Sequence, residues 1–229
     1  MEHHYYFLVE IFNAMGLEHF AHKFEHVLYS WLIMALLIIG AWLLAKGLQM
    51  IPLKGQNVLE LVVGGLEDFM VEITGPEGRA FFPYIATVFL FILFCNLIGL
   101  FPGFVSPTAN LNTTLALALC TFVLTHYIGF KFHGPKYFKH FLGPVMAMAP
   151  IMVIIELIGH FARVMSLSIR LFGNIFGKEK VLGIFFALAG LYLAPLPILF
   201  LGILVSFIQA VVFMLLSIVY FAGAMEEAH

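Results

Sequence analysis

The chain has 229 residues, of which 62% are hydrophobic and only 10% are charged, and its formal net charge at pH 7 is −2. Soluble domains hold about 25% charged residues, so this composition excludes the soluble classes and indicates that lipid is the main solvent. The few lysines and arginines form no long basic run, which excludes an electrostatic footprint for nucleic acid.

The segment 1–26 is expected to lie outside the membrane at the N-terminus. Its glutamates and histidines give the wrong charge for the basic start of a signal peptide, so we expect the segment to be retained. His19, His22 and His26 are spaced three and four residues apart, as metal ligands on a helix can be. No His-Glu-x-x-His pattern accompanies them, and solvated interfacial histidines are the simpler interpretation. We expect no metal and no cofactor.

Crossing a hydrocarbon core of about 30 Å takes roughly 20 apolar residues in a helix. Three runs of suitable length and composition predict membrane spans at residues 27–45, 81–101 and 113–130. Between the first two, residues 57–73 repeat apolar side chains at helical spacing, with acidic residues largely on the opposite side. This pattern predicts an amphipathic helix that lies on the membrane surface.

The helical pattern of residues 146–192 continues through several charged residues. At 1.5 Å per residue such a helix would be roughly 70 Å long, more than twice the thickness of the hydrocarbon core. It must therefore be steeply tilted, broken, or made of two segments. Pro195 and Pro197 then predict a turn, and residues 198–222 predict a last apolar helix.

The expected fold class is an all-α integral membrane protein with about five membrane-embedded hydrophobic helices plus one interfacial amphipathic helix. We expect residues 1–229 to form a single membrane domain, in which the last two helices form a long tilted hairpin. Lys and Arg occur on both sides of the surface helix and after residues 113–130, whereas residues 103–112 contain none. Because short cytoplasmic loops are enriched in Lys and Arg, we expect the N-terminus outside and the C-terminus in the cytoplasm.

A polar stripe runs along one face of the long helix. At 100° per residue its members fall within about 40° of one line, and they are Glu156, His160, Arg163, Arg170, Asn174 and Lys178. Small residues lie beside the stripe, namely Gly159, Ser166, Gly173 and Gly177. Small residues let another helix approach closely. We interpret this face as a charged surface along which a partner slides.

Arg170 is the central charge of this stripe. An arginine near the middle of a membrane is disfavoured by about 2.5 to 3.5 kcal/mol on insertion scales, so something must face it. Because its guanidinium keeps its proton at physiological pH, Arg170 can hold a fixed positive charge but cannot relay protons. Opposite a membrane carboxylate it would force release of a proton or sodium ion. The alternative is that Arg163 and Arg170 pair with Glu156 or extend to an interface.

The segment Ser166-Leu-Ser-Ile-Arg-Leu-Phe-Gly-Asn174 resembles the signature of F-type ATP synthase subunit a. Arg170 occupies the position of the arginine that faces the rotating c-ring carboxylates in that family. The resemblance extends over nearly the whole chain, including Asn96, Pro102, residues 107–114 and residues 209–214.

The resemblance implies a proton-translocating stator subunit of the membrane sector, without a catalytic residue of its own, in a bacterial inner membrane. Its implied partners are the c-ring and the peripheral-stalk b subunits, and the ATP chemistry belongs to other subunits. Five further residues match polar positions of the two aqueous half-channels or the ring-facing surface: Glu156, Ser166, Asn174, Glu179 and Gln209. Arg170 would separate the half-channels. The ion carried, H⁺ or Na⁺, would be selected by the ring.

Two features depart from the family pattern. Many members carry a histidine seven residues before the glutamine, where this chain has Gly202, so Glu179 is expected to lack its usual partner. Lys178 and Lys180 also bracket Glu179, which indicates a rearranged path on the outer side. The alternatives are a surface ion pair between Glu179 and one of these lysines, and a purely interhelical hydrogen bond for Gln209.

Two other functions fit these residues less well. A secondary ion-coupled transporter often shows paired repeats and broken helices, and we find no internal repeat. An intramembrane enzyme should offer a nucleophile with a base, or a metal triad, at membrane depth. Glu156 and His160 are the only such neighbours here, and they have no third member.

Overall fold

The computed structural model describes residues 23–47, 54–101, 103–134, 137, 149–189 and 196–226. The segment 1–22 with His19 and His22 lies outside the described residues, as do Pro102, Lys136, Lys139 and Pro195. The described residues form six α-helices and two short 3₁₀ helices. In chain order these are α3 (Glu25–Lys46), α4 (Lys54–Thr74), η1 (Pro76–Phe81), α5 (Phe82–Ile98), η2 (Pro107–Ala109), α6 (Leu111–His133), α8 (Ala149–Ala189) and α9 (Leu196–Met225).

Among the described residues, five helical segments are long and apolar enough to cross a membrane. They are Glu25–Lys46, Pro76–Ile98, Leu111–His133, Ile151–Phe185 and Leu196–Met225. Large apolar side chains cover their outer surfaces, and Ile38, Phe161 and Phe200 expose 69%, 68% and 73% of their area. Exposing so much apolar surface is unfavourable in water but not in lipid. The predicted all-α membrane fold class with five apolar helices is confirmed.

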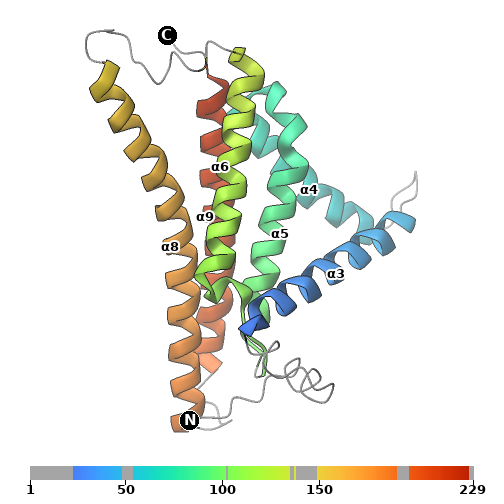
Figure 1. Ribbon diagram of the computed structural model, residues 1–229. Coiled ribbons are helices and arrows are strands. Elements are labelled where there is room, and N and C mark those ends of the chain that lie inside the picture. Colours follow the sequence, from blue (N-terminus) through green and yellow to red (C-terminus); the bar gives the residue numbers. More distant parts are fainter. Residues whose placement is uncertain are drawn as a thin grey trace.

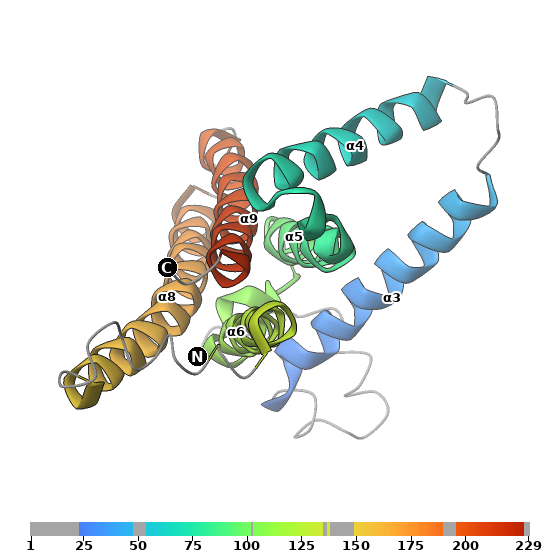
Figure 2. The same cartoon turned by 90° about the horizontal axis from the view of Figure 1, so that it is seen from above.

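α4 is the amphipathic helix of the structure. Leu61 and Val62 near its middle are exposed, whereas Met70 near its end is fully buried in the core. Seen from above, α3 and α4 extend to the same side of the bundle (Figure 2). α4 is therefore anchored to the other helices through its C-terminal part.

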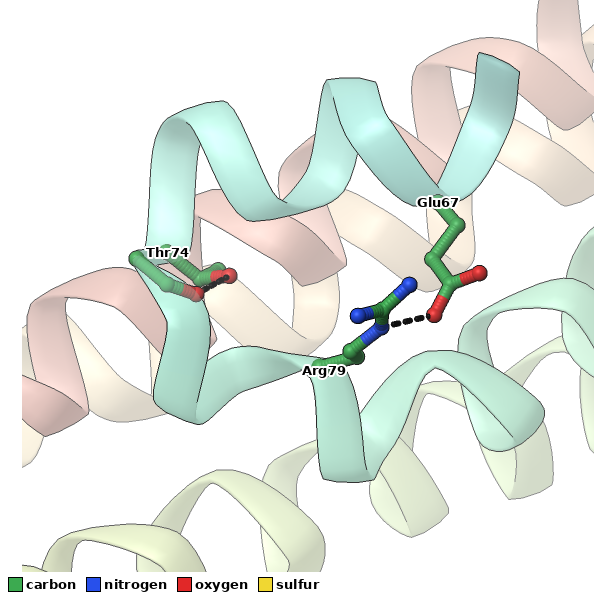
Figure 3. A network of polar contacts seen from close by, with 4 residues as sticks. Glu67, Thr74 and Arg79 are labelled. Atoms are coloured by element: carbon green, nitrogen blue, oxygen red, sulfur yellow. Dashed lines mark hydrogen bonds and ion pairs between the residues drawn. The ribbon is translucent and has the colours of Figure 1, made fainter. Parts of the chain in front are cut away.

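The turn from α4 into η1 fixes this anchor. Gly75 has a φ of 75°, a left-handed conformation that favours glycine, and it lets the chain reverse direction. The Thr74 hydroxyl donates to the carbonyl of Met70 at 2.8 Å. Arg79 on η1 forms an ion pair with Glu67 on α4, as Figure 3 shows. The Thr74 hydrogen bond lies within the last turn of α4, and the Arg79–Glu67 ion pair joins α4 to η1 at the start of the following span.

The core lies where α5, α6, α8 and α9 meet (Figure 1). α9 packs against all three of the others, and its Phe213, Ile218 and Phe221 are completely buried. Ile92 of α5 and Leu171 of α8 complete this apolar centre. Since lipid supplies no hydrophobic drive between helices, close packing of these side chains holds the bundle together.

α8 is one continuous helix of 41 residues. At 1.5 Å per residue it is roughly 60 Å long, so it can remain in the bilayer only by tilting. Figure 1 shows it inclined against α6 and α9, and α9 runs in the opposite direction. The structure thus has an unbroken helix over Ala149–Ala189, and its tilt in the bilayer stays a prediction from its length.

α3 joins the bundle through its first turns. Leu28, Tyr29 and Ile33 are its buried residues, and the Tyr29 hydroxyl donates to the carbonyl of Gly103 at 3.3 Å. Beyond them α3 diverges from the bundle, and Trp42 exposes 56% of its surface. Lipid therefore surrounds most of its length.

We predict that Phe213→Ala destabilises the full chain far more than Phe200→Ala on the same helix. Phe213 is fully buried, and truncating such a ring costs about 3 to 5 kcal/mol in soluble cores. Phe200 is 73% exposed and should lose little, so it is the matched control. The measurement is the midpoint of thermal unfolding in lipid nanodiscs, and equal midpoints for the two variants would contradict the packing described here.

Candidate functional site

α8 divides its residues between a packed face and an open face. Val164, Leu167, Leu171 and Ile175 are buried against the bundle. Of the polar stripe predicted from the sequence, Arg163, Arg170 and Asn174 are exposed, Glu156 and Lys178 are half-buried, and His160 is buried. The stripe therefore borders the packed face, and its exposed residues are open to water or to a partner.

Arg170 is linked along its own helix to Ser166. Its Nη2 donates to Ser166 Oγ at 3.2 Å, one turn earlier. A single hydroxyl neutralises little of a full positive charge, and such charges in membranes face cavities or pair with other groups. The guanidinium is therefore available to a group approaching from outside this chain.

Asn174 and Gln209 join the stripe to the next helix. Asn174 Nδ2 donates to Gln209 Oε1 at 2.8 Å, and the Gln209 side chain on α9 is buried. The interhelical hydrogen bond considered for Gln209 is thus present. Because Asn174 lies one turn after Arg170, this bond fixes the part of α8 that carries the arginine.

The two carboxylates of the predicted site lie towards opposite ends of α8. Glu156 precedes Arg170 by 14 residues and Glu179 follows it by 9. These separations correspond to roughly 21 Å and 14 Å along the axis, a total close to the thickness of a hydrocarbon core. One fixed cation therefore stands between two acidic groups that are too far apart to touch.

Glu179 is held by the connection between α5 and α6. Its Oε1 accepts a hydrogen bond from the backbone N–H of Ser106 at 2.7 Å. The same oxygen lies against Gly99, where a Cβ would approach it to 2.5 Å and would also meet Ser106 Cβ at 2.8 Å. Gly99 thus provides the space into which the carboxylate fits.

A buried polar network supports this contact. Ser106 Oγ donates to the carbonyl of Cys95 at 2.6 Å and lies 2.8 Å from Thr108 Oγ1. Thr108 Oγ1 in turn donates to Asn96 Oδ1 at 2.6 Å. Asn96, Ser106 and Thr108 are all fully buried. Satisfied networks of this kind are rigid, so the backbone N–H that faces Glu179 has a defined position.

Lys178 is a part of the site whose partners the sequence did not reveal. Its Nζ donates to the carbonyl of Asn96 at 2.7 Å and to Ser206 Oγ at 3.0 Å. Ser206 Oγ also donates to the carbonyl of Gly202 at 2.7 Å. Lys178 and Glu179 therefore take different partners, and the lysine ties α8 to both α5 and α9.

Gly202 gives the Lys178 side chain room to pass. A Cβ at position 202 would lie 2.7 Å from Leu100 Cδ2 and 3.5 Å from Lys178 Cδ. A larger side chain at this position would need the space that Leu100 and Lys178 occupy. Gly202 is therefore the residue that lets Leu100 and Lys178 pack closely against α9.

At the other end of α8, Glu156 pairs with His160. His160 Nε2 lies 3.3 Å from Glu156 Oε1, and His160 is buried. Arg163 lies over the ring of Tyr220 on α9, 5.8 Å from its centroid. Glu156 is therefore engaged by a histidine, and Arg163 and Arg170 have other neighbours.

We predict that Gly99→Ala lowers the thermal unfolding midpoint of the full chain in nanodiscs below that of Gly183→Ala. The added methyl at 99 would separate Glu179 from the Ser106 backbone, whereas nothing lies within 4 Å of a Cβ at 183. Alanine in a helix interior is otherwise favoured over glycine by about 1 kcal/mol. A midpoint for Gly99→Ala equal to or above that of the control would refute the close fit of Glu179.

Comparison with known proteins gives a consistent result over the length of the chain. The family described as ATP synthase A chain matches residues 27–222. The chain is 58% identical to ATP synthase subunit a of Desulfosudis oleivorans over 229 residues, which is 100% of both chains. It is 55% identical over 239 aligned positions to that of Syntrophobacter fumaroxidans, again 100% of both. With that of Geotalea daltonii the identity is 57% over 205 residues, 90% of this chain and 89% of the relative.

The range matched by the family includes Arg170 and both carboxylates of the site. The family predicted from the segment 166–174 is confirmed: this chain belongs to the ATP synthase A chain family.

Proposed function

We propose that the chain is the proton-translocating stator subunit in the membrane sector of a rotary F-type ATP synthase of a bacterial inner membrane. The observation that carries the proposal is the position of Arg170, exposed on α8 between Glu156 and Glu179. ATP chemistry belongs to other subunits of the complex, and this chain contributes torque by moving ions past a fixed charge.

Arg170 acts electrostatically in this proposal. A proton enters through one half-channel and neutralises a carboxylate of the c-ring, which then travels through lipid for most of a turn. When the carboxylate comes opposite Arg170, the positive charge favours its ionised form and the proton leaves through the other half-channel. The same charge repels cations that would cross directly from one half-channel to the other.

Ser166, Asn174 and Gln209 give this charge a defined position. Ser166 accepts from the guanidinium, and the Asn174–Gln209 hydrogen bond fixes the adjacent turn of α8 to α9. We assign Glu156 to the half-channel near the loop after α6 and Glu179 to the other one. Each carboxylate concentrates protons in its own water path, which needs partial hydration and no metal.

The orientation proposed from the positive-inside rule fits the packing. Lys131 Nζ at the end of α6 lies 5.4 Å from the ring centroid of Phe81 in η1, so the loops bearing Lys131 and Arg79 meet at one end of the bundle. We place this end in the cytoplasm, with the N-terminus outside and the C-terminus inside. Glu156 then serves the cytoplasmic half-channel and Glu179 the outer one.

The remaining partners follow from the exposed surfaces and the family. We assign the open face of α8 to the c-ring, whose helices can approach closely along Gly173 and Gly177. Peripheral-stalk b subunits and lipid are proposed to cover other outer surfaces. A secondary transporter is less well supported, because such folds use broken helices near the midplane and α8 is continuous.

We predict that Arg170→Ala abolishes ATP-driven proton pumping by the assembled complex in inverted membrane vesicles. The expected loss is more than about tenfold, since a change of roughly 1.4 kcal/mol in a barrier already alters a rate tenfold. Arg79→Ala is the matched control, because Arg79 forms a surface ion pair with Glu67 and such pairs contribute little. Full pumping by assembled Arg170→Ala complexes, with an unchanged passive leak, would contradict the electrostatic role assigned to Arg170.

A further inference from the structure

Two histidines meet between α6 and α8, away from Arg170. The ring centroids of His126 on α6 and His160 on α8 lie 4.7 Å apart, with an interplanar angle of 68°. His160 is only 8% exposed. An ionisable residue inside a membrane segment costs free energy and usually marks an ion pathway. We therefore expect this pair to take part in ion movement.

The pair belongs to a longer chain of proton-holding groups. His160 Nε2 lies 3.3 Å from Glu156 Oε1, and His126 Nδ1 lies 2.8 Å from the hydroxyl of Tyr137. Burial raises the pKa of Tyr137, so its hydroxyl keeps its proton and can donate to His126. Tyr137 lies just beyond α6, and Glu156 is half-buried near the N-terminal end of α8. The groups therefore form a line from Tyr137 to Glu156.

A cleft opens beside His160. Its lining includes Thr121 and Thr125 of α6, His160 and Arg163 of α8, and Tyr220 of α9. Its volume is about 20 Å³, and roughly 10 to 15 Å³ holds one water molecule. The threonine hydroxyls and the imidazole would give such a water polar partners.

We propose that His160 is a proton-carrying residue of the cytoplasmic half-channel, which exchanges protons with Glu156 and is positioned by His126 and Tyr137. This proposal rests on the proposed function. In the step, the O–H bond of protonated Glu156 breaks and an N–H bond forms at His160 Nε2. The imidazolium then releases the proton on its other nitrogen to water in the cleft, and the reverse order carries a proton inward.

The charges around His160 favour transfer of its extra proton over retention of that proton on the imidazole. The titratable and charged groups near it are Glu156 and Arg163 on α8, His126 on α6, Tyr137 beyond it, Tyr220 on α9 and, through Thr121, Tyr84 on α5. Glu156 stabilises a proton on His160, whereas Arg163 and a protonated His126 oppose it. Because two adjacent positive charges repel each other, the two imidazoles are not expected to carry an extra proton at the same time.

The test is the pH profile of ATP-driven proton pumping by the whole complex in inverted vesicles. We expect His160→Gln to assemble, to pump more slowly, and to lose the part of the profile that changes between about pH 5 and pH 8, where histidine titrates. His133→Gln, at the end of α6, is the matched control and should keep the wild-type profile. An assembled His160→Gln complex with wild-type rate and profile overturns the relay.

A second variant separates proton transfer from structure. His160→Ala leaves space beside the cleft, and we expect added imidazole to restore its pumping rate, whereas His160→Phe should not respond. Failure of imidazole to raise the rate of an assembled His160→Ala complex also overturns the relay.

Gly129→Ala tests the positioning of His126 by Tyr137. The added Cβ would lie 2.3 Å from the Tyr137 ring, so we expect this variant to shift the pH profile of pumping. Absence of pumping by the wild-type complex would instead reject the proposed function.

Discussion

A permanent positive charge in a membrane-spanning helix is the constraint on which the rest of this structure depends. Arg170 cannot lose its proton, and its own helix offers it one hydroxyl, that of Ser166. Lipid cannot stabilise such a charge. α8 must therefore leave Arg170 exposed while another of its faces packs into the bundle, and the packed residues Leu171 and Ile175 set that orientation.

Holding that face still requires polar contacts on both sides of the arginine. Asn174 bonds to Gln209 on α9, and Lys178 reaches the backbone of α5 and a hydroxyl of α9. At the far end, His160 packs against His126 of α6. Hydrogen bonds between membrane helices average about 0.6 kcal/mol each, so their main effect is to fix rotation and depth. The helix that carries the charge is thus tied to every neighbour in the core.

The fold class and family could be predicted because they depend on local patterns. Run length and apolar content identify membrane helices, and the spacing of Arg170 with Ser166 and Asn174 places them on one face of a helix. The contacts of Lys178 and Glu179 could not be predicted, because their partners lie 82 and 73 residues away. Likewise His160 was placed on the stripe, but its meeting with His126 depends on the register between two helices. His19 and His22, for which metal binding was an alternative, lie outside the described residues. The roles assigned to the site residues stay predictions.

The tilt of α8 has a geometric consequence for any partner built of upright helices. A tilted helix that packs against a row of upright helices crosses each of them at a different height. The ends of α8 that carry Glu156 and Glu179 would then adjoin different members of the row, so the two proposed access paths would be separated sideways as well as in depth. An ion carrier moving along the row would load beside one member and unload beside another. The inclination of a single helix is enough to produce this sideways offset.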